Sequence, residues 1–189
     1  MSFVPNMTTL RGAGGTSFDF ALPVRSNLTM GHLSDLKHME LPAKMMRTDR
    51  GVRLEASTSS SKGIFIPYVQ NACVYGYAGG GTKWIGSGPF SGCHLAFFLD
   101  AGRLGLAHVA VDGSGDAMDA WEAFSARPGV NVINKWKIPL AFNGTQAMGT
   151  YLFLDVHKDS KIRLTQMDVS VTTMGGGEGT VYEVKSIIN

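Results

Sequence analysis

The chain holds two cysteines, and one of them, Cys93, is followed fifteen residues later by a histidine, His108. An ordinary thiol has a pKa of about 8.5, whereas a thiol beside an imidazole can ionise well below neutrality and become a strong nucleophile. A cysteine next to a histidine is therefore the minimal pair for acyl transfer. Ser87 precedes Cys93 by six residues and is a candidate to hydrogen-bond the imidazole and orient it.

Two apolar segments would have to bring these residues together. The stretch FSGCHLAFFLD contains Cys93 and runs into a turn at 100–102, and RLGLAHVAV then returns with His108 near its end. Two strands of about seven residues joined by a short turn place residues near their outer ends side by side. We therefore expect His108 beside Cys93. Gly92 lets the backbone approach closely at the turn and is expected to contact the substrate, and the amide of Cys93, with one from the preceding loop, could form an oxyanion hole.

The Ser-Gly-Cys turn at 91–93, with His108 fifteen residues later, resembles the signature of the cytotoxic necrotizing factor catalytic domain and its relatives. These include the Burkholderia lethal factor and the chemoreceptor glutamine deamidases. Members of the group carry such a turn, a following strand and a histidine on the next strand. Several have a threonine where this chain has Ser87, and a leucine is common where it has Phe90.

This resemblance implies a cysteine-dependent protein glutamine deamidase, possibly also a transglutaminase, and a bacterial effector or toxin. Cys93 would attack a glutamine carboxamide of a protein substrate, and His108 would give a proton to the departing ammonia and then activate water. The resemblance implies neither a metal nor an organic cofactor. It also implies a β-sandwich with flanking helices.

The surface that recognises the substrate is expected in the loops around the cleft. Lys83 and Trp84 lie in the glycine-rich stretch before Cys93 and are candidate contact residues. An aromatic residue next to glycines can equally be part of the core, so both interpretations of Trp84 stay open.

Two other functions remain open from the residues alone. The same Cys–His pair could serve a small cysteine peptidase or amidase. Alternatively, Cys93 could be buried and inert in a non-enzymatic β-sandwich binding module, because cysteine is among the most often buried residues. His94 should point away from Cys93, since neighbouring side chains of a strand face opposite sides. Asp112 or Asp116 could orient His108 instead of Ser87.

The spacing of turns predicts a β-rich fold in a single domain, residues 1–189. Twenty-four glycines separate short apolar runs, which is typical of strands joined by turns. GDAMDAWEAFSARPG predicts a helix with Ala117, Trp121 and Phe124 on one face and Asp116 as its cap. A shorter helix is expected from Ser34 to about residue 40. Together with the resemblance, these patterns predict an α+β fold with a β-sandwich core of mixed or antiparallel strands and a few flanking helices.

Charge and hydropathy bear on partners and location. The formal net charge is +2 and no stretch concentrates Lys and Arg, so nucleic acid is not an expected partner. No apolar run approaches the roughly 20 residues needed to span a bilayer, so no membrane partner is expected. No secretory signal is expected either, and we expect the bacterial cytoplasm followed by signal-peptide-independent delivery. His32, His38 and His157 have no partners at metal-ligand spacing, so no metal site is expected.

Overall fold

Strands make up most of the chain that the structure describes. The computed structural model describes residues 2–22, 36–59, 62–111, 115–156, 163–171 and 177–188, with 60% of these residues in strands and 9% in helices. The elements are, in chain order, β1 (Ser2–Phe3), α1 (Met7–Leu10), β2 (Ser17–Ala21), β3 (Leu36–His38), β4 (Leu41–Thr48), β5 (Gly51–Ala56), β6 (Ile64–Pro67), β7 (Cys73–Tyr77), β8 (Trp84–Phe90), β9 (His94–Asp100), β10 (Arg103–Val109), α2 (Asp116–Ser125), β11 (Val130–Lys137), β12 (Ala141–Asn143), β13 (Gln146–Asp155), β14 (Arg163–Val171) and β15 (Gly177–Ile188).

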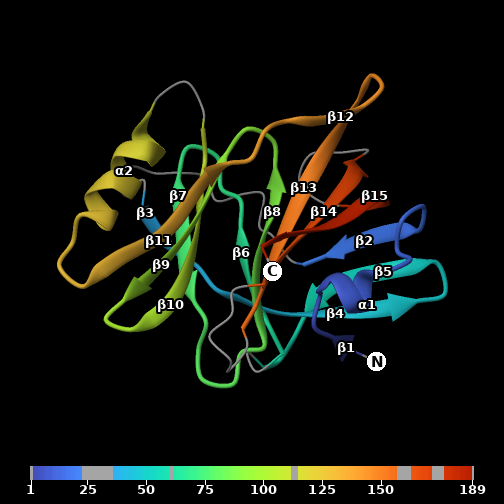
Figure 1. Ribbon diagram of the computed structural model, residues 1–189, viewed down its shortest axis with the longest axis horizontal. Helices are drawn as coiled ribbons and strands as arrows, with labels where there is room; N and C mark the ends of the chain where they lie inside the picture. Colours follow the sequence, from blue (N-terminus) through green and yellow to red (C-terminus); the bar gives the residue numbers. More distant parts are fainter. Residues whose placement is uncertain are drawn as a thin grey trace.

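Eight strands close into a barrel, on the right of the view in Figure 1. The strands follow the order β4-β5-β2-β15-β14-β13-β8-β6, and β6 pairs back onto β4 through Leu41 and Phe65. Alternate side chains along each strand point inward and fill the barrel, as the period of two requires. The barrel core consists of Leu10, Ala13, Phe18, Phe20, Leu22, Ala43, Met45, Val52, Leu54, Phe65, Trp84, Tyr151, Phe153, Met167, Val169 and Val181.

The predicted fold class is wrong. We expected an α+β sandwich with flanking helices, whereas the protein is mostly β, with a closed eight-stranded barrel and a second sheet. Period-two patterns identify strands, but they do not say whether a sheet remains open or closes on itself. Closure here depends on the pairing of β4 with β6, which the local pattern of neither strand reveals.

A second sheet of five strands lies beside the barrel in the order β11-β9-β10-β7-β3. One face packs against the barrel through Leu95, Phe97 and Leu106, among others. The opposite face is covered by α2, whose Trp121 and Phe124 pack on residues of this sheet. We call these two surfaces the barrel face and the α2 face. The second sheet is therefore the middle layer between the barrel and α2.

The helix predicted after residue 115 is confirmed as α2, with Ala117, Trp121 and Phe124 buried. Its N-cap is Gly115 rather than Asp116, and no side chain caps it. The shorter predicted helix is wrong where the structure describes it, since Leu36–His38 form β3, which pairs in parallel with β7. Residues 34 and 35 lie outside the described residues.

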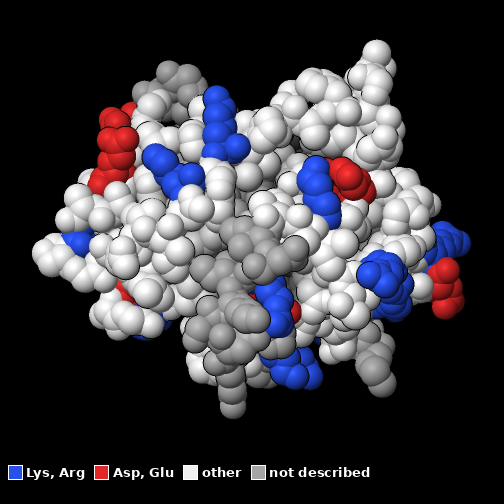
Figure 2. All heavy atoms as spheres, viewed as in Figure 1, with Lys and Arg blue, Asp and Glu red and all other residues white. Residues whose placement is uncertain are grey.

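The expected pair of strands around Cys93 and His108 is confirmed as the β9–β10 hairpin, with seven residues in each strand. Near the C-terminus, β13 and β14 also pair antiparallel. None of the described helices has the length and hydropathy needed to cross a membrane. Figure 2 shows Lys and Arg side chains scattered over the face drawn, with uncharged surface between them.

Candidate active site

Cys93 and His108 lie at one end of the second sheet, because Cys93 connects β8 to the start of β9 and His108 is near the end of β10. Cys93 comes directly before β9, and its backbone extends the ladder between β9 and β11. The amide of Ile138 donates to the carbonyl of Cys93 at 2.9 Å, and the amide of Gly92 donates to the carbonyl of Ile138 at 2.9 Å. The loop that carries the thiol is thus held by the sheet itself.

The register of the hairpin places Cys93 and His108 on the same face. His108 lies directly opposite Leu95, and Cys93 precedes Leu95 by two residues, so all three side chains point toward the barrel. Such diagonal neighbours on adjacent antiparallel strands have Cα atoms about 7–8 Å apart, within reach of longer side chains. Cys93 is 6% exposed and His108 is 1% exposed.

Ser87 holds the imidazole of His108 in one tautomer. The hydroxyl of Ser87 donates to the carbonyl of Ile66 at 2.7 Å, and its Oγ lies 2.9 Å from Nδ1 of His108. Because the single hydroxyl proton is used on Ile66, Oγ must accept the hydrogen bond from Nδ1–H. The second ring nitrogen, Nε2, therefore carries the lone pair of a neutral imidazole.

Nε2 of His108 is buried and has no hydrogen-bond partner among the described residues. It follows that the thiol of Cys93 is not hydrogen-bonded to it in this state. A buried acceptor left unpaired costs about 1–3 kcal/mol. Such groups are rare in native proteins, and a catalytic role is one of their explanations. Asn71 Oδ1 and His94 Nδ1 are the other two such atoms among the described residues.

Two aromatic rings flank the imidazole. The ring of Phe90 stacks on His108 with a centroid separation of 4.0 Å and an interplanar angle of 15°, and the ring of Tyr68 lies 5.3 Å away at 53°. Burial lowers the pKa of His108 to about 3, because the charged form loses its hydration. The imidazole is therefore neutral at physiological pH and free to accept a proton at Nε2, but a pKa this far below 7 makes it a weak base in this state.

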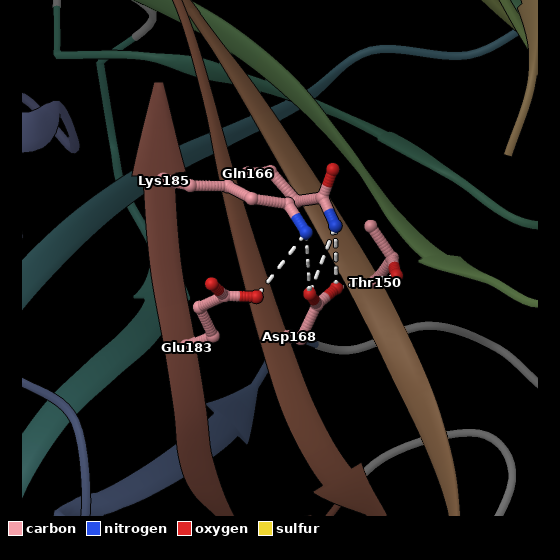
Figure 3. A network of polar contacts seen from close by, with 5 residues as sticks. All are labelled: Thr150, Gln166, Asp168, Glu183 and Lys185. Carbon is pink, nitrogen blue, oxygen red and sulfur yellow. Dashed lines mark hydrogen bonds and ion pairs between the residues drawn. The ribbon is translucent and has the colours of Figure 1, made fainter. Parts of the chain in front are cut away.

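A row of polar contacts joins β13, β14 and β15 in the barrel wall (Figure 3). Phe90 pairs with Thr150 on β13, which pairs with Asp168 on β14. The carboxylate of Asp168 accepts hydrogen bonds from Thr150 at 2.6 Å and from Gln166 at 2.9 and 2.8 Å, and Lys185 lies 3.6 Å away. Since its oxygens are already occupied, we assign Asp168 a structural role.

Gly92 adopts a backbone conformation that favours glycine, with φ of +106°. A Cβ atom there would meet no other atom within 4 Å, so the backbone angle and not crowding selects glycine. Its amide is already used on Ile138. Gly92 is therefore not an available oxyanion donor, although the open space in front of it leaves contact with a substrate possible.

Lys83 and Trp84 lie far from the thiol. They stand at the start of β8, whereas the loop with Cys93 follows its end, about 20 Å away for a strand of this length. Trp84 is 1% exposed and packs edge-on against Phe153 inside the barrel. Its position argues against a contact with substrate and fits the interpretation as a core residue. Lys83 is exposed, but it belongs to the opposite end of the strand.

The other candidate partners of the imidazole do not meet it. His94 lies on the α2 face, as expected from the alternation along β9. Asp116 does not bind the ring of His108, whose Nδ1 faces Ser87 and whose Nε2 has no partner in the part of the chain that the structure describes. Asp112 lies outside the described residues.

Of the three histidines considered as metal ligands, His38 is the one within the described residues. His38 lies 2.8 Å from Glu40, and His32 and His157 fall outside the described ranges. Within those ranges, no group of three or more His, Cys, Asp or Glu side chains could hold a metal ion.

Sequence reasoning did not foresee three residues around His108. The backbone carbonyl of Ile66 accepts a hydrogen bond from the hydroxyl of Ser87, and no side-chain pattern signals this contact. Tyr68 comes from the connection between β6 and β7, remote in sequence from the motif. Phe90 stands inside the motif, where its departure from the common leucine was the one available signal.

Comparison with known proteins adds no relative to this picture. No family model matches the chain, and no curated protein matches its sequence. The resemblance to the deamidase group therefore stays a prediction that rests on the motif residues.

Proposed function

We propose that this protein is a cysteine-dependent glutamine deamidase that acts on a side-chain amide of a protein substrate. Cys93 is the nucleophile, His108 is the general base and acid, and Ser87 orients His108. The observation that carries the proposal is the unpartnered Nε2 of a neutral, buried imidazole, held through Nδ1 on the face that carries the thiol. The motif resemblance supports the same assignment, with a bacterial effector or toxin as its setting.

The proposed reaction follows from the protonation states. As the sulfur of Cys93 attacks the carboxamide carbon, the thiol proton passes to Nε2 of His108. Nε2–H then protonates the nitrogen, the C–N bond breaks, and ammonia leaves a thioester on Cys93. Water gives a proton to Nε2 as it attacks the thioester, and the thiol is regenerated with release of glutamate. A primary amine in place of water would give an isopeptide bond.

The lowered pKa of His108 suits the second of these steps. Because burial disfavours the imidazolium, no stable thiolate–imidazolium pair is expected before the substrate binds. Once the imidazole has taken the thiol proton, it is a strong acid and readily protonates the leaving nitrogen.

Burial of the thiol favours a side-chain amide over a peptide bond as substrate. Cys93 is 6% exposed, at the junction of two packed layers. A glutamine side chain is slender and ends in its carboxamide, so it can reach a recessed sulfur. A peptide bond continues as main chain on both sides and would need a wider opening. The recessed position of Cys93 therefore favours the deamidase over the peptidase.

The test is a search for the modified glutamine. We would incubate wild-type protein, Cys93→Ala and the matched control Cys73→Ala with host-cell and bacterial lysates, then identify Gln-to-Glu conversions by mass spectrometry. We expect conversions with wild type and Cys73→Ala and none with Cys93→Ala. New peptide termini without conversions would instead identify a peptidase.

The rate at which iodoacetamide alkylates Cys93 at pH 7 distinguishes an active Cys93–His108 pair from a buried, inert cysteine. An active pair predicts that His108→Ala slows labelling, because the general base is lost. Equal slow labelling of wild type and His108→Ala would contradict the enzyme assignment.

A further inference from the structure

Tyr68 is a partly exposed neighbour of the buried imidazole. It follows β6 of the barrel and precedes β7 of the second sheet, so it lies on a connection that crosses between the two layers. Its ring lies 5.3 Å from that of His108. Ser87 and Phe90, which also contact the imidazole, are completely buried, whereas Tyr68 is 38% exposed. Of these three neighbours, Tyr68 alone reaches the surface.

The surroundings of the imidazole favour uncharged groups. Among the described residues, burial is the only cause that lowers the pKa of His108, and no charge contributes to it. The titratable side chains of that part of the chain that face it are the thiol of Cys93 and the phenol of Tyr68. An ionised group placed there would lose its hydration without gaining a counter-ion, whereas a carboxamide has only dipoles to desolvate.

We infer that Tyr68 is a specificity-determining residue at the entrance of the Cys93–His108 site, where its ring admits uncharged carboxamide groups and excludes carboxylates. This inference rests on the proposed function, because it names the chemical class that the same site takes. The same ring also favours product release, because glutamate is charged and is disfavoured beside it.

The test compares two alkylating probes of similar size, iodoacetamide and iodoacetate. Each reacts by the same displacement, in which the sulfur–carbon bond forms and iodide leaves. The rate of each at Cys93 is divided by its rate with glutathione, which removes the intrinsic difference between the reagents. We expect the normalised rate for iodoacetamide to exceed that for iodoacetate by at least about tenfold, since burying a carboxylate is costly.

Four variants assign the selectivity to Tyr68. Tyr68→Ala admits water and should bring the ratio close to one, whereas Tyr68→Phe keeps the ring and should keep the ratio. Tyr68→Lys puts a cation at the entrance and should favour iodoacetate, which gives a second reading if the alanine variant folds poorly. Tyr182→Ala removes a tyrosine that is 57% exposed on β15 and should change nothing. Cys73 is completely buried and serves as the internal unreactive thiol.

A ratio near one in the wild type, or an unchanged ratio in both Tyr68→Ala and Tyr68→Lys, would overturn the inference. NMR titration of the His108 ring gives an independent reading, because Tyr68→Ala should raise the pKa of His108 and Tyr68→Phe should not. The ratio is measured whether or not His108 accelerates alkylation. If His108→Ala leaves the iodoacetamide rate unchanged, the proposed function fails while the role of Tyr68 is still decided by the ratio.

Discussion

Each face of the second sheet carries one of the two cysteines. On the α2 face Cys73 is buried, with His38 on β3 and His94 on β9, and on the barrel face Cys93 has His108. We compare the buried pair Cys93 and His108 with Cys73 and His94. On the α2 face, Cys73 and His94 both pair with Val109 of β10, one from each side, so strand β10 lies between them. On the barrel face the two residues stand on adjacent strands.

The surroundings of the two pairs differ as much as their spacing. Burial raises the pKa of Cys73 to about 12, which leaves it a neutral thiol in the core. Burial and the charges of Lys135 and Lys137 lower the pKa of His94. Among the described residues a buried ring nitrogen is unpaired in both histidines, Nδ1 of His94 and Nε2 of His108, but on the barrel face Ser87 also fixes the tautomer of the imidazole. The two faces therefore differ in how the histidine is held and not in residue types alone.

The largest expected contrast is between the two cysteines. Cys93→Ala should reduce Gln-to-Glu conversion by at least about a thousandfold, because the nucleophile is lost. Cys73→Ala should leave the conversion rate unchanged and lower the free energy of unfolding by about 1 kcal/mol through the cavity it creates. Mass spectrometry of the substrate and urea unfolding measure the two effects. Loss of activity in Cys73→Ala at full stability would break the comparison.

The two histidines should differ nearly as much. His108→Ala removes the general base and acid, which contributes about 10²- to 10⁴-fold in such enzymes. His94→Ala should leave the conversion rate nearly unchanged, because its ring lies on the α2 face. The readout is the initial rate of conversion at saturating substrate. Equal losses of conversion rate in His108→Ala and His94→Ala would contradict the assignment of the active site to the barrel face.

The pH dependence of stability tests the burial of His108. In the folded protein the pKa is about 3, whereas an unfolded histidine has a pKa of about 6.5. As the pH falls below 6.5, protons bind the unfolded chain first. The stability contributed by the neutral imidazole is therefore present above pH 6.5 and is lost as the pH falls toward 3.

Between pH 7 and pH 5, the wild type should accordingly lose about 2 kcal/mol more free energy of unfolding than His108→Leu. Urea unfolding of both proteins at the two pH values measures the difference. His94 is present in both proteins, so its contribution cancels. An identical loss in the two proteins would mean that His108 is accessible to protons in the folded state.

Ser87 should have the smallest of these effects. Ser87→Ala removes the acceptor for Nδ1–H and frees the imidazole to change tautomer, which should lower the conversion rate by about tenfold. Ser87→Thr keeps the hydroxyl and should retain more of the rate. Both variants are compared with wild type in the same conversion assay. Activity of Ser87→Ala equal to that of wild type would remove Ser87 from the site.

Some of the site could be predicted because its pattern is local. The two apolar segments, the short turn at 100–102 and the positions of Cys93 and His108 define the hairpin and its face. The spacing of Ser87 made it a candidate partner of the imidazole. Trp84 could not be placed in the same way, because a period-two pattern does not distinguish the inside of a closed barrel from a surface that contacts substrate.

Short-range patterns thus account for α2, the β9–β10 hairpin and the presence of a thiol and an imidazole on one face. Contacts between distant segments decided the rest. The pairing of β4 with β6 closes the barrel, and the carbonyl of Ile66 accepts the hydrogen bond from Ser87. The ring of Tyr68 lies against that of His108. Periodicity depends only on neighbouring residues, whereas the pKa and tautomer of His108 depend on which remote groups surround it. Only the packed layers bring those groups there.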